Sequence, residues 1–321
     1  MMPLPSKVKE AATQLVLAAN TDILLFNSPI ERPGDRRFIS DCLARKFRPN
    51  LLLILLTSGG DPDAAYRISR TLQNHYENFV CCIPSMCKSA GTLILLGASE
   101  LVFTECGEIG PLDIQLAKKD DLWGQESGLT TMTALTALHE SAQDAFDHFL
   151  VSLTVHSGGR ITTRTASEVA AKLTEALYSP ISAQIDPIHM GEVNRSMAIA
   201  EHYGKRLVSK WKNCELDTLK TLISGYPSHG FVIDSAEASK LFKNVRGCSP
   251  EEAALLKEMG AVARVLSDTP IVKFISDEVE EHSDDQPKEV LEQPGLDGPA
   301  PTPPGNVPEN GKQPTGPEIT G

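Results

Sequence analysis

The sequence predicts an α/β fold with a parallel central sheet. Short, continuous apolar runs of strand length, at residues 51–57 and 78–84, each end at a glycine, serine or proline step. A stretch with the helical spacing of apolar residues follows each step, and this alternation of strand and helix is typical of parallel sheets. Beyond residue 130 the apolar residues recur every three or four positions, which predicts a helical C-terminal part.

The first strand and helix lie between residues 51 and 75. The strand LLLILLT is apolar on both faces, which suits a central parallel strand, and Ser58-Gly59-Gly60 ends it. At the start of the following helix, Asp61 is placed to cap the amino terminus. Pro62 suits the first helical position.

The second pair is the strand NFVCCIP followed by AGTLILLGA at residues 90–98. Pro84 stops the strand, and Ser89 or a neighbour starts the helix. Because this helix is apolar all round and rich in glycine and alanine, it is predicted to be short and buried. ELVFTE then predicts a third strand, and GEIGPLDIQ predicts a turn with a further extended piece.

Helices dominate the rest of the folded part. The apolar residues from Thr130 predict one long amphipathic helix that ends at Ser157-Gly158-Gly159. Thr165, with a glutamate three residues later, resembles a capping box that would start the next helix. Three more helices are predicted for EVNRSMAIAEHYGKRLV, ELDTLKTLI and SAEASKLF, a strand for GFVID, and a last helix from Ser249 to about residue 267.

The charge is uneven along the 321 residues, which carry a formal net charge of −12. Residues 271–321 hold eleven acidic against three basic residues and nine of the 22 prolines, which predicts a disordered, acidic, proline-rich tail. We therefore expect a folded domain at residues 1–270 and a tail at residues 271–321. The folded part is close to neutral, which argues against nucleic acid as a partner.

The seven cysteines form neither a disulfide framework nor a CxxC pair that would bind zinc. Adjacent Cys81 and Cys82 would point to opposite faces of a strand, so they cannot jointly bind one metal. Nucleotide-binding and HExxH motifs are absent from the sequence, and we expect no cofactor. The free thiols, together with the lack of a signal segment and of a membrane-spanning run, predict a cytoplasmic protein.

Two strand ends carry residues suited to chemistry. Each strand feeds a helix amino terminus, where backbone N–H groups lack intrahelical acceptors and suit a developing negative charge. Ser58-Gly59-Gly60 offers bare backbone at the first end, and Lys88-Ser89-Ala90-Gly91 offers a hydroxyl at the second. If the two strands are neighbours, both ends lie at one edge of the sheet. A serine beside two backbone donors is the minimum apparatus for acyl transfer.

Four linked segments between residues 20 and 245 are distinctive: TSGGDPDAAYRISRTL, CKSAGTLILLGASELVFTECGEIGPLDIQ, QIDPIHMGEVNRSMAIAEHYGKRL and YPSHGFVID. In this order they resemble the serine dehydrogenase proteinase family of Clp-fold serine peptidases, which has signal peptide peptidase A and ClpP as more distant relatives. The resemblance implies a ClpP/crotonase-like fold of repeated ββα units, a homo-oligomer and a polypeptide substrate. It also implies Ser89 as the nucleophile, with the N–H groups of Gly60 and Ala90 as the oxyanion hole.

The resemblance does not fix the general base. ClpP uses a histidine on the strand after the helix, whereas this chain has Asp113 at the corresponding place. The signal peptide peptidase branch uses a lysine, and the nearest downstream lysines here are Lys118 and Lys119. A lysine suits this role only when burial lowers its pKa. Lys88 ranks lower because successive side chains diverge, and His229 in YPSHG is a further candidate.

Several of these residues also have a structural interpretation. Ser89 could simply cap the helix that follows it, and the lysines of KKDD could belong to a solvated loop. Asp186 and the nearby His189 would hold a turn through bonds to the backbone. His139 and His148 lie beside the apolar stripe of the long helix, at its boundary with solvent.

Three functions are compatible with these residues. The first is a serine peptidase of Clp fold, and the second is a catalytically weak Clp-fold scaffold. The third is a crotonase-like acyl-thioester enzyme, which needs the two backbone donors but not the hydroxyl of Ser89. A peripheral membrane partner and an unfoldase partner stay open at this stage.

Overall fold

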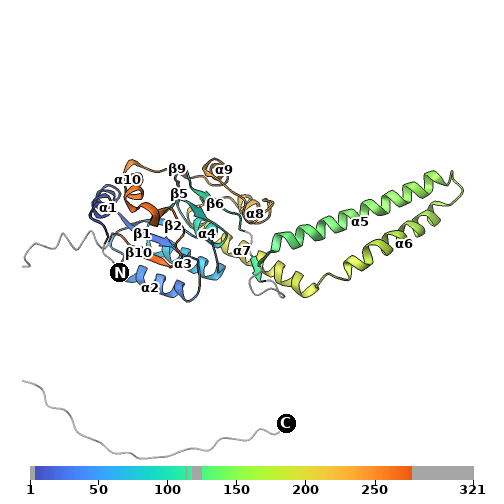
Figure 1. Cartoon of the computed structure of the whole chain (residues 1–321), viewed down its shortest axis with the longest axis horizontal. Coiled ribbons are helices and arrows are strands. Elements are labelled where there is room, and N and C mark those ends of the chain that lie inside the picture. Colours follow the sequence, from blue (N-terminus) through green and yellow to red (C-terminus); the bar gives the residue numbers. More distant parts are fainter. Residues whose placement is uncertain (1–3, 113–114, 118–124, 277–321) are drawn as a thin grey trace, which may run out of the picture. The chain divides into compact units, whose positions relative to one another are not determined.

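The central sheet confirms the predicted α/β fold. The computed structural model describes residues 4–112, 115–117 and 125–276, with the backbone alone at 115–117 and 125–132. The strands of the sheet follow the order β10-β1-β2-β3-β5-β9, and all neighbours are parallel except β1 and β10 (Figure 1). Their bounds are β1 (Thr21–Asn27), β2 (Asn50–Leu56), β3 (Asn78–Ile83), β5 (Glu100–Phe103), β9 (Val245–Gly247) and β10 (Ile271–Phe274).

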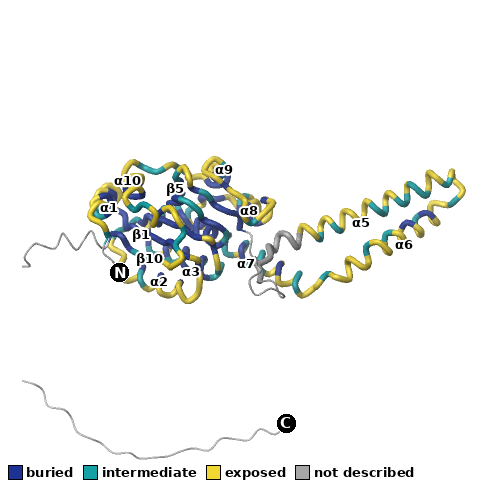
Figure 2. The backbone as a smooth tube through the Cα atoms, viewed as in Figure 1, coloured by how far each residue is buried: buried dark blue, intermediate teal, exposed yellow. Residues whose placement is uncertain are grey.

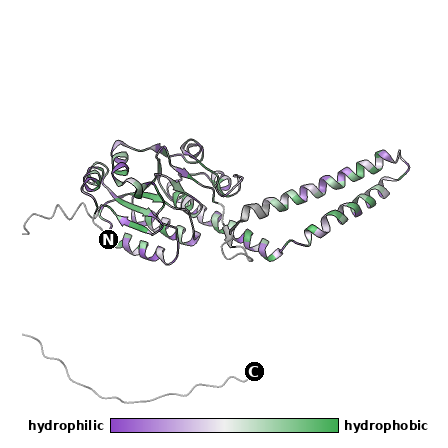
Figure 3. Ribbon diagram, in the orientation of Figure 1, coloured by the Kyte–Doolittle hydropathy of each residue, from purple (hydrophilic) through white to green (hydrophobic). Residues whose placement is uncertain are grey.

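The sheet is buried on both faces, as the continuous apolar runs predict, and its strands are largely hydrophobic (Figure 3). Cys81 lies in the cluster of buried apolar side chains on one face and Cys82 in the cluster on the other, as predicted for adjacent residues of a strand. Helices supply the other half of each cluster, with α1 (Ser6–Ala19) and α10 (Pro250–Met259) on one face, and α2 (Gly34–Ala44), α3 (Pro62–His75) and α4 (Ala90–Leu95) on the other.

A second, smaller sheet lies at the carboxyl ends of the central strands. β4 (Met86–Cys87) runs parallel to β6 (Glu108–Ile109). Isolated parallel β-bridges also join Thr57 to Cys87 and Ile30 to Gly60. Along the chain, β1, β2 and β3 are each followed by one of these short extended pieces and then by a helix. This order confirms the repeated ββα units.

The predicted helical part is present. β7 (Gln115–Ala117) pairs antiparallel with β8 (Gln125–Ser127) and precedes α5 (Gly128–His156), which packs along α6 (Thr163–Ser182) and α7 (Pro187–Trp211). Most described residues of α5 and α6 are exposed or half-buried (Figure 2). α8 (Leu216–Ser224) and α9 (Ser235–Leu241) complete this part and contribute buried side chains to the core.

The predicted start of α6 is wrong. The helix begins at Thr163, because the Thr162 side chain accepts a hydrogen bond from the N–H of Thr165 and caps it. The glutamate expected to complete a box with Thr165 is Glu168, and its carboxylate instead pairs with Arg164 at 3.1 Å. The cap therefore lies before the predicted position.

Two more element predictions are wrong. The GFVID segment at 230–234 forms only a single bridge, between Ile233 and Ile109, rather than a strand. The last helix, α10, ends at Met259 rather than near residue 267. Gly260 follows with φ 60°, a conformation that ends the helix, and the 3-10 helix η1 (Gly260–Ala263) comes next.

β10 lies beyond residue 270, where the sequence predicts the tail to begin. It pairs antiparallel with β1, and the next residues, Ile275 and Ser276, are buried. The folded part therefore extends to at least Ser276, because the apolar residues at the start of the predicted tail complete the edge of the sheet. Residues 277–321 of that tail lie outside the described part of the chain.

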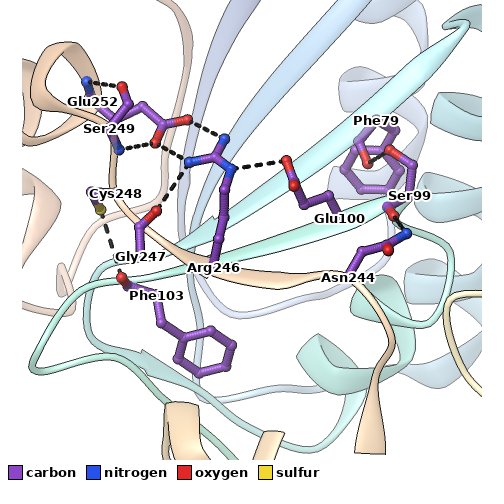
Figure 4. Close-up of polar contacts among 10 residues, drawn as sticks. All are labelled: Phe79, Ser99, Glu100, Phe103, Asn244, Arg246, Gly247, Cys248, Ser249 and Glu252. Carbon is purple, nitrogen blue, oxygen red and sulfur yellow. Dashed lines mark hydrogen bonds and ion pairs between the residues drawn. The ribbon is translucent and has the colours of Figure 1, made fainter. Parts of the chain in front are cut away.

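An ion-pair network joins β9 to β5 and α10 (Figure 4). Arg246 donates to the two carboxylate oxygens of Glu252 at 2.6 and 2.8 Å, and to Glu100 at 3.0 Å. Glu252 also accepts from the N–H of Ser249, whose hydroxyl accepts from the N–H of Glu252, as predicted for this helix start. The three charged side chains are paired with one another, which indicates a structural role.

Candidate active site

The residues singled out at the two strand ends meet in one cleft. The cleft has a volume of about 790 Å³, and its lining includes Ser58-Gly59-Gly60 after β2 and Ser89-Ala90 at the start of α4. β2 and β3 are parallel neighbours, so both junctions lie at the same edge of the sheet, as expected. Further walls come from the segment after β1, the start of α3, the middle of α7 and the loop that carries His229.

Ser89 has a backbone conformation that residues other than glycine rarely adopt, with φ 51° and ψ −116°. The residue lies directly between β4 and α4, and its side chain makes no capping hydrogen bond to the helix. The interpretation of this serine as a simple helix cap is therefore wrong. Backbone strain of this kind clusters at active sites, and the nucleophile of α/β-hydrolases occupies a similarly strained turn from strand to helix.

The glycine turn after β2 fits closely against Ser89. Gly59 has a φ of 104°, and a Cβ atom there would lie 2.8 Å from the Ser89 Cβ and 2.9 Å from the Lys88 carbonyl oxygen. Gly60 has a φ of 138°, and a Cβ atom there would overlap the carbonyl oxygen of Ile30. Only glycine combines these backbone angles with this close approach.

At this junction the backbone N–H groups of Gly60 and Ala90 have no acceptor within the described ranges. Ala90 is the first residue of α4, so its N–H lies at the partially positive end of that helix. The turn that carries Gly60 is held by the preceding residue, because the N–H of Gly59 donates to the Thr57 hydroxyl at 3.1 Å. Both N–H groups therefore belong to residues that border the cleft and are fixed by local structure.

Small residues let α4 approach the strands closely. A Cβ atom at Gly91 would lie 2.5 Å from Thr57 Cγ2 and 2.7 Å from Cys87 Sγ. At the next residue, the Thr92 hydroxyl donates to the carbonyl oxygen of Gly110 at 2.7 Å. All six residues of α4 are buried, as predicted. The helix is thus fixed to both sheets and holds its first residue at the cleft.

Cys87 lies two residues before Ser89 but is not suited to be the nucleophile. Its side chain is fully buried, and this burial raises the pKa of the thiol well above its usual range, with the Lys88 charge opposing the shift. The thiol form, which is a poor nucleophile, therefore persists. In the described part of the chain, no group of three or more His, Cys, Asp or Glu residues could hold a metal ion.

Lys88 precedes Ser89 but does not line the cleft. Its ammonium group forms an ion pair with Glu108 at 2.9 Å and donates to the carbonyl oxygens of Ile109 at 3.4 Å and Phe231 at 3.3 Å. The side chain is only 9% exposed. Because an ammonium group has three donors and all three are engaged, Lys88 is not placed to take a proton from the serine.

Among the other candidates for the general base, His229 lines the same cleft as Ser89. Asp113, Lys118 and Lys119 lie outside the described residues. The sequence prediction for Lys118 and Lys119 therefore stays a prediction. The structure brings one of the named candidates, His229, into the cleft with Ser89.

The remaining histidines singled out by the sequence lie elsewhere. His139 and His148 are exposed on α5. Asp186 caps α7 by accepting a hydrogen bond from the N–H of Ile188 at 2.8 Å, which confirms its predicted structural role. His189, also on α7, lies 3.8 Å from the carboxylate of Glu192.

Neighbouring groups engage two of the carboxylates at the cleft. Asp61 caps α3, as predicted, by accepting from the N–H of its third residue at 2.9 Å. Asp63 accepts from the hydroxyl of Tyr203 at 2.8 Å, and this bond raises the pKa of that tyrosine. Arg32 lies 3.8 Å from the Asp61 carboxylate and 3.6 Å from the Asp63 carboxylate. These contacts fix the side chains of Asp61 and Asp63 at the wall of the cleft.

Sequence reasoning missed two walls of the cleft. Pro29 and Glu31 follow β1, a strand that was not predicted although TDILLFN at residues 21–27 is an apolar run of strand length. Ile199 and Ala200 come from α7, whose helical pattern was recognised but whose neighbours were not. The strand at residues 21–27 could have been predicted from the sequence. That α7 borders the cleft follows only from the tertiary fold.

Comparison with known proteins gives matches among solved structures. The fold is similar to that of a serine-to-alanine variant of a membrane-bound stomatin-specific protease, with 13% identity, a TM-score of 0.43, and 75% of this chain and 84% of that chain covered. A lysine-to-alanine variant of the same protease, in complex with a substrate peptide, gives 14% identity, a TM-score of 0.37, and 75% and 80% coverage. No protein-family profile and no curated protein sequence matches the chain. Both scores are low, and the function of this chain has to be inferred from its own cleft.

None of the helices in the described ranges combines the length and the apolar character needed to cross a membrane.

Proposed function

We propose that this protein is a serine-type peptidase, with Ser89 as the nucleophile and the N–H groups of Gly60 and Ala90 as the oxyanion hole. The proposal rests on one observation, the strained junction between β4 and α4, which places a serine in a cleft beside two backbone donors. A serine that served only to start a helix would need neither the strain nor the glycine turn packed against it.

The chemistry follows from this arrangement. The Ser89 oxygen attacks the carbonyl carbon of the scissile bond as the hydroxyl proton passes to a base, and the carbonyl oxygen becomes an oxyanion. The N–H groups of Gly60 and Ala90 donate hydrogen bonds to this oxyanion. Its collapse breaks the carbon–nitrogen bond, and the amine leaves with a proton. Water then hydrolyses the acyl-serine and regenerates the hydroxyl.

A polypeptide is the substrate that the cleft and the sequence favour together. Leu93, Leu112 and Ile199 give the cleft an apolar wall that suits a side chain of the substrate. The sequence resemblance to the serine dehydrogenase proteinase family points to the same substrate class. The predicted homo-oligomer and the predicted cytoplasmic localisation stay predictions.

A fluorophosphonate probe tests the proposal without knowledge of the substrate. The purified full-length chain is incubated with the probe, and the adduct is mapped by mass spectrometry beside Ser89→Ala. Ser58→Ala is the matched control, because Ser58 is a second serine that lines the cleft. We expect an adduct at Ser89 that Ser89→Ala loses and Ser58→Ala retains.

Two other results would overturn the proposal. A folded protein that is not labelled at Ser89 would favour the catalytically weak scaffold. Hydrolysis of acyl-thioesters that persists in Ser89→Ala would favour the crotonase-like enzyme, since that chemistry needs the oxyanion donors but not the hydroxyl.

A further inference from the structure

The loop between α8 and α9 carries His229 to the cleft and is anchored on both sides of that residue. On the amino-terminal side, the ring of Tyr226 packs against the ring of Phe231, with centroids 4.9 Å apart, and its hydroxyl donates to Glu237 at 3.1 Å. The loop is half-buried at His229 itself. The histidine is thus held between packed residues.

On the carboxyl-terminal side, the loop joins the small sheet. Ile233 exchanges two backbone hydrogen bonds with Ile109, at 2.9 and 3.0 Å. Lys88 donates to the Phe231 carbonyl oxygen, two residues after His229, and at the same time to Ile109. A Cβ atom at Gly110 would lie 2.7 Å from the Lys88 Cδ, so the absence of a side chain at this glycine leaves room for the lysine stem.

Lys88 therefore connects the two parts of the cleft. Its backbone is continuous with Ser89, and its buried ammonium group holds the loop that brings His229 to the same cleft. Lys88 does not line the cleft, so its contacts give it no part in binding the substrate. They do explain how a loop from a distant part of the sequence keeps its place at the cleft.

We infer that His229 takes the proton of the Ser89 hydroxyl, and that Lys88 is a positioning residue that holds the His229 loop at the cleft. This inference rests on the proposed function. As the bond between the serine oxygen and the substrate carbon forms, the hydroxyl proton moves to a ring nitrogen of His229. The imidazolium then gives the same proton to the leaving amine, so no further reactant is needed.

The other titratable side chains lining the cleft are less suited to this step. Among the described residues they are Glu31, Asp61 and Asp63, and a carboxylate is a weaker base toward a serine hydroxyl than an imidazole. Two of them are also engaged, Asp61 as the cap of α3 and Asp63 with the Tyr203 hydroxyl. An imidazole is the side chain that most often serves as a general base.

The test is the rate of fluorophosphonate labelling at Ser89 in the full-length chain. We expect His229→Ala and His229→Gln to slow labelling about 100-fold or more, and added imidazole to restore part of the rate of His229→Ala. The matched control is His148→Ala, which removes an exposed histidine of α5 and should label at the wild-type rate.

Lys88 is tested by a pair of variants that keep its aliphatic stem. Lys88→Met removes the donors and should slow labelling about tenfold to 100-fold, because a small displacement of a catalytic group has a large effect on rate. Lys88→Arg keeps the donors and should restore most of the rate. The ring resonances of His229 should shift in Lys88→Met and not in Lys88→Arg, under conditions where both variants are fully folded.

The outcomes separate this inference from the proposed function. Labelling of His229→Ala at the wild-type rate would overturn the role of His229 while Ser89 stays the nucleophile, as would a loss confined to Lys118→Ala or Lys119→Ala. A slow His229→Ala beside a normal His229→Gln would assign the histidine a structural role and overturn the inference. Labelling of Lys88→Met at the wild-type rate would overturn the positioning role. If the wild-type chain itself is not labelled, the proposed function fails first.

Discussion

Replacing Gly91 with alanine should slow the chemistry at Ser89 more than it weakens the fold. The added Cβ would lie 2.5 Å from Thr57 Cγ2 and 2.7 Å from Cys87 Sγ, and both side chains are fully buried. Overpacking of this kind costs about 1–3 kcal/mol of folding free energy. The better helix propensity of alanine offsets about 1 kcal/mol of that loss. We therefore expect a folded variant that is less stable by at most about 2 kcal/mol.

The effect on the chemistry follows from the displacement. Ordinary van der Waals contact begins near 3.4 Å, so the start of α4 and Thr57 must separate by about 0.9 Å, the difference between 3.4 and 2.5 Å. Ser89 and Ala90 directly precede Gly91 and must move with it. Since a misplacement of about 1 Å can cost about 100-fold in rate, we expect fluorophosphonate labelling of Gly91→Ala to slow about tenfold to 100-fold.

Gly97→Ala is the matched control at the other end of the same segment. A Cβ atom there would overlap the hydroxyl of Ser69, which donates to the carbonyl oxygen of Ile94. This variant should also lose about 1–3 kcal/mol, measured by urea denaturation. Its Ser89 should label at close to the wild-type rate. Full labelling of Gly91→Ala, or an equal loss in Gly97→Ala at the same folded fraction, would refute the reasoning.

Three further predictions concern single side chains. Ala90→Val should crowd the oxyanion site and slow labelling of Ser89 at least about tenfold in the folded protein, a larger effect than its loss of stability; an equal loss of rate and stability would contradict the role of Ala90. Burial, with the Glu237 carboxylate as the second cause, raises the pKa of Tyr226 from its ordinary value of 10.0 to about 12. Below pH 10 this tyrosine is protonated whether folded or unfolded, and its contribution is complete; as the pH rises toward 12 the unfolded chain loses the proton first, so stability falls. The free energy of unfolding of Tyr226→Phe should fall less over this range than that of the wild type, and parallel curves would argue against the shift. Arg246→Met should lower the free energy of unfolding by about 1–3 kcal/mol, because it leaves the buried Glu252 carboxylate with the N–H of Ser249 but without the guanidinium group. The double variant with Glu252→Met should recover most of this loss in urea denaturation, and no recovery would argue against the ion pair as its cause.

The local features of the fold were predictable wherever one short pattern determined the structure. LLLILLT became a central strand because it is apolar on both faces. Asp61 capped its helix because its carboxylate and Pro62 stand at the right spacing. Where two patterns competed, the prediction failed. Thr162 and Thr165 both suit a cap, and the structure has the cap at Thr162.

The edge of the sheet shows why composition alone misplaced the end of the folded part. The tail is acidic and rich in proline on average, but Ile271–Phe274 is a short apolar segment at its start. Its strand forms only by pairing with β1, far away in the sequence, and local composition carries no signal for such a partner. β9 escaped prediction for a similar reason, since three residues are too few to show a period.

The candidate site likewise contains residues that the sequence could predict and residues that it could not. The serine, the glycine turn and the small first residues of α4 could be read from the sequence because their roles depend on backbone geometry. The position of His229 could not, because the contact that secures its loop joins Lys88 to Phe231 across 143 positions of the chain. Lys88 stands next to the nucleophile in the sequence, yet its buried ammonium group serves the loop. Adjacent residues at the end of one short strand thus supply the reacting hydroxyl and the anchor for the loop that carries its proposed base.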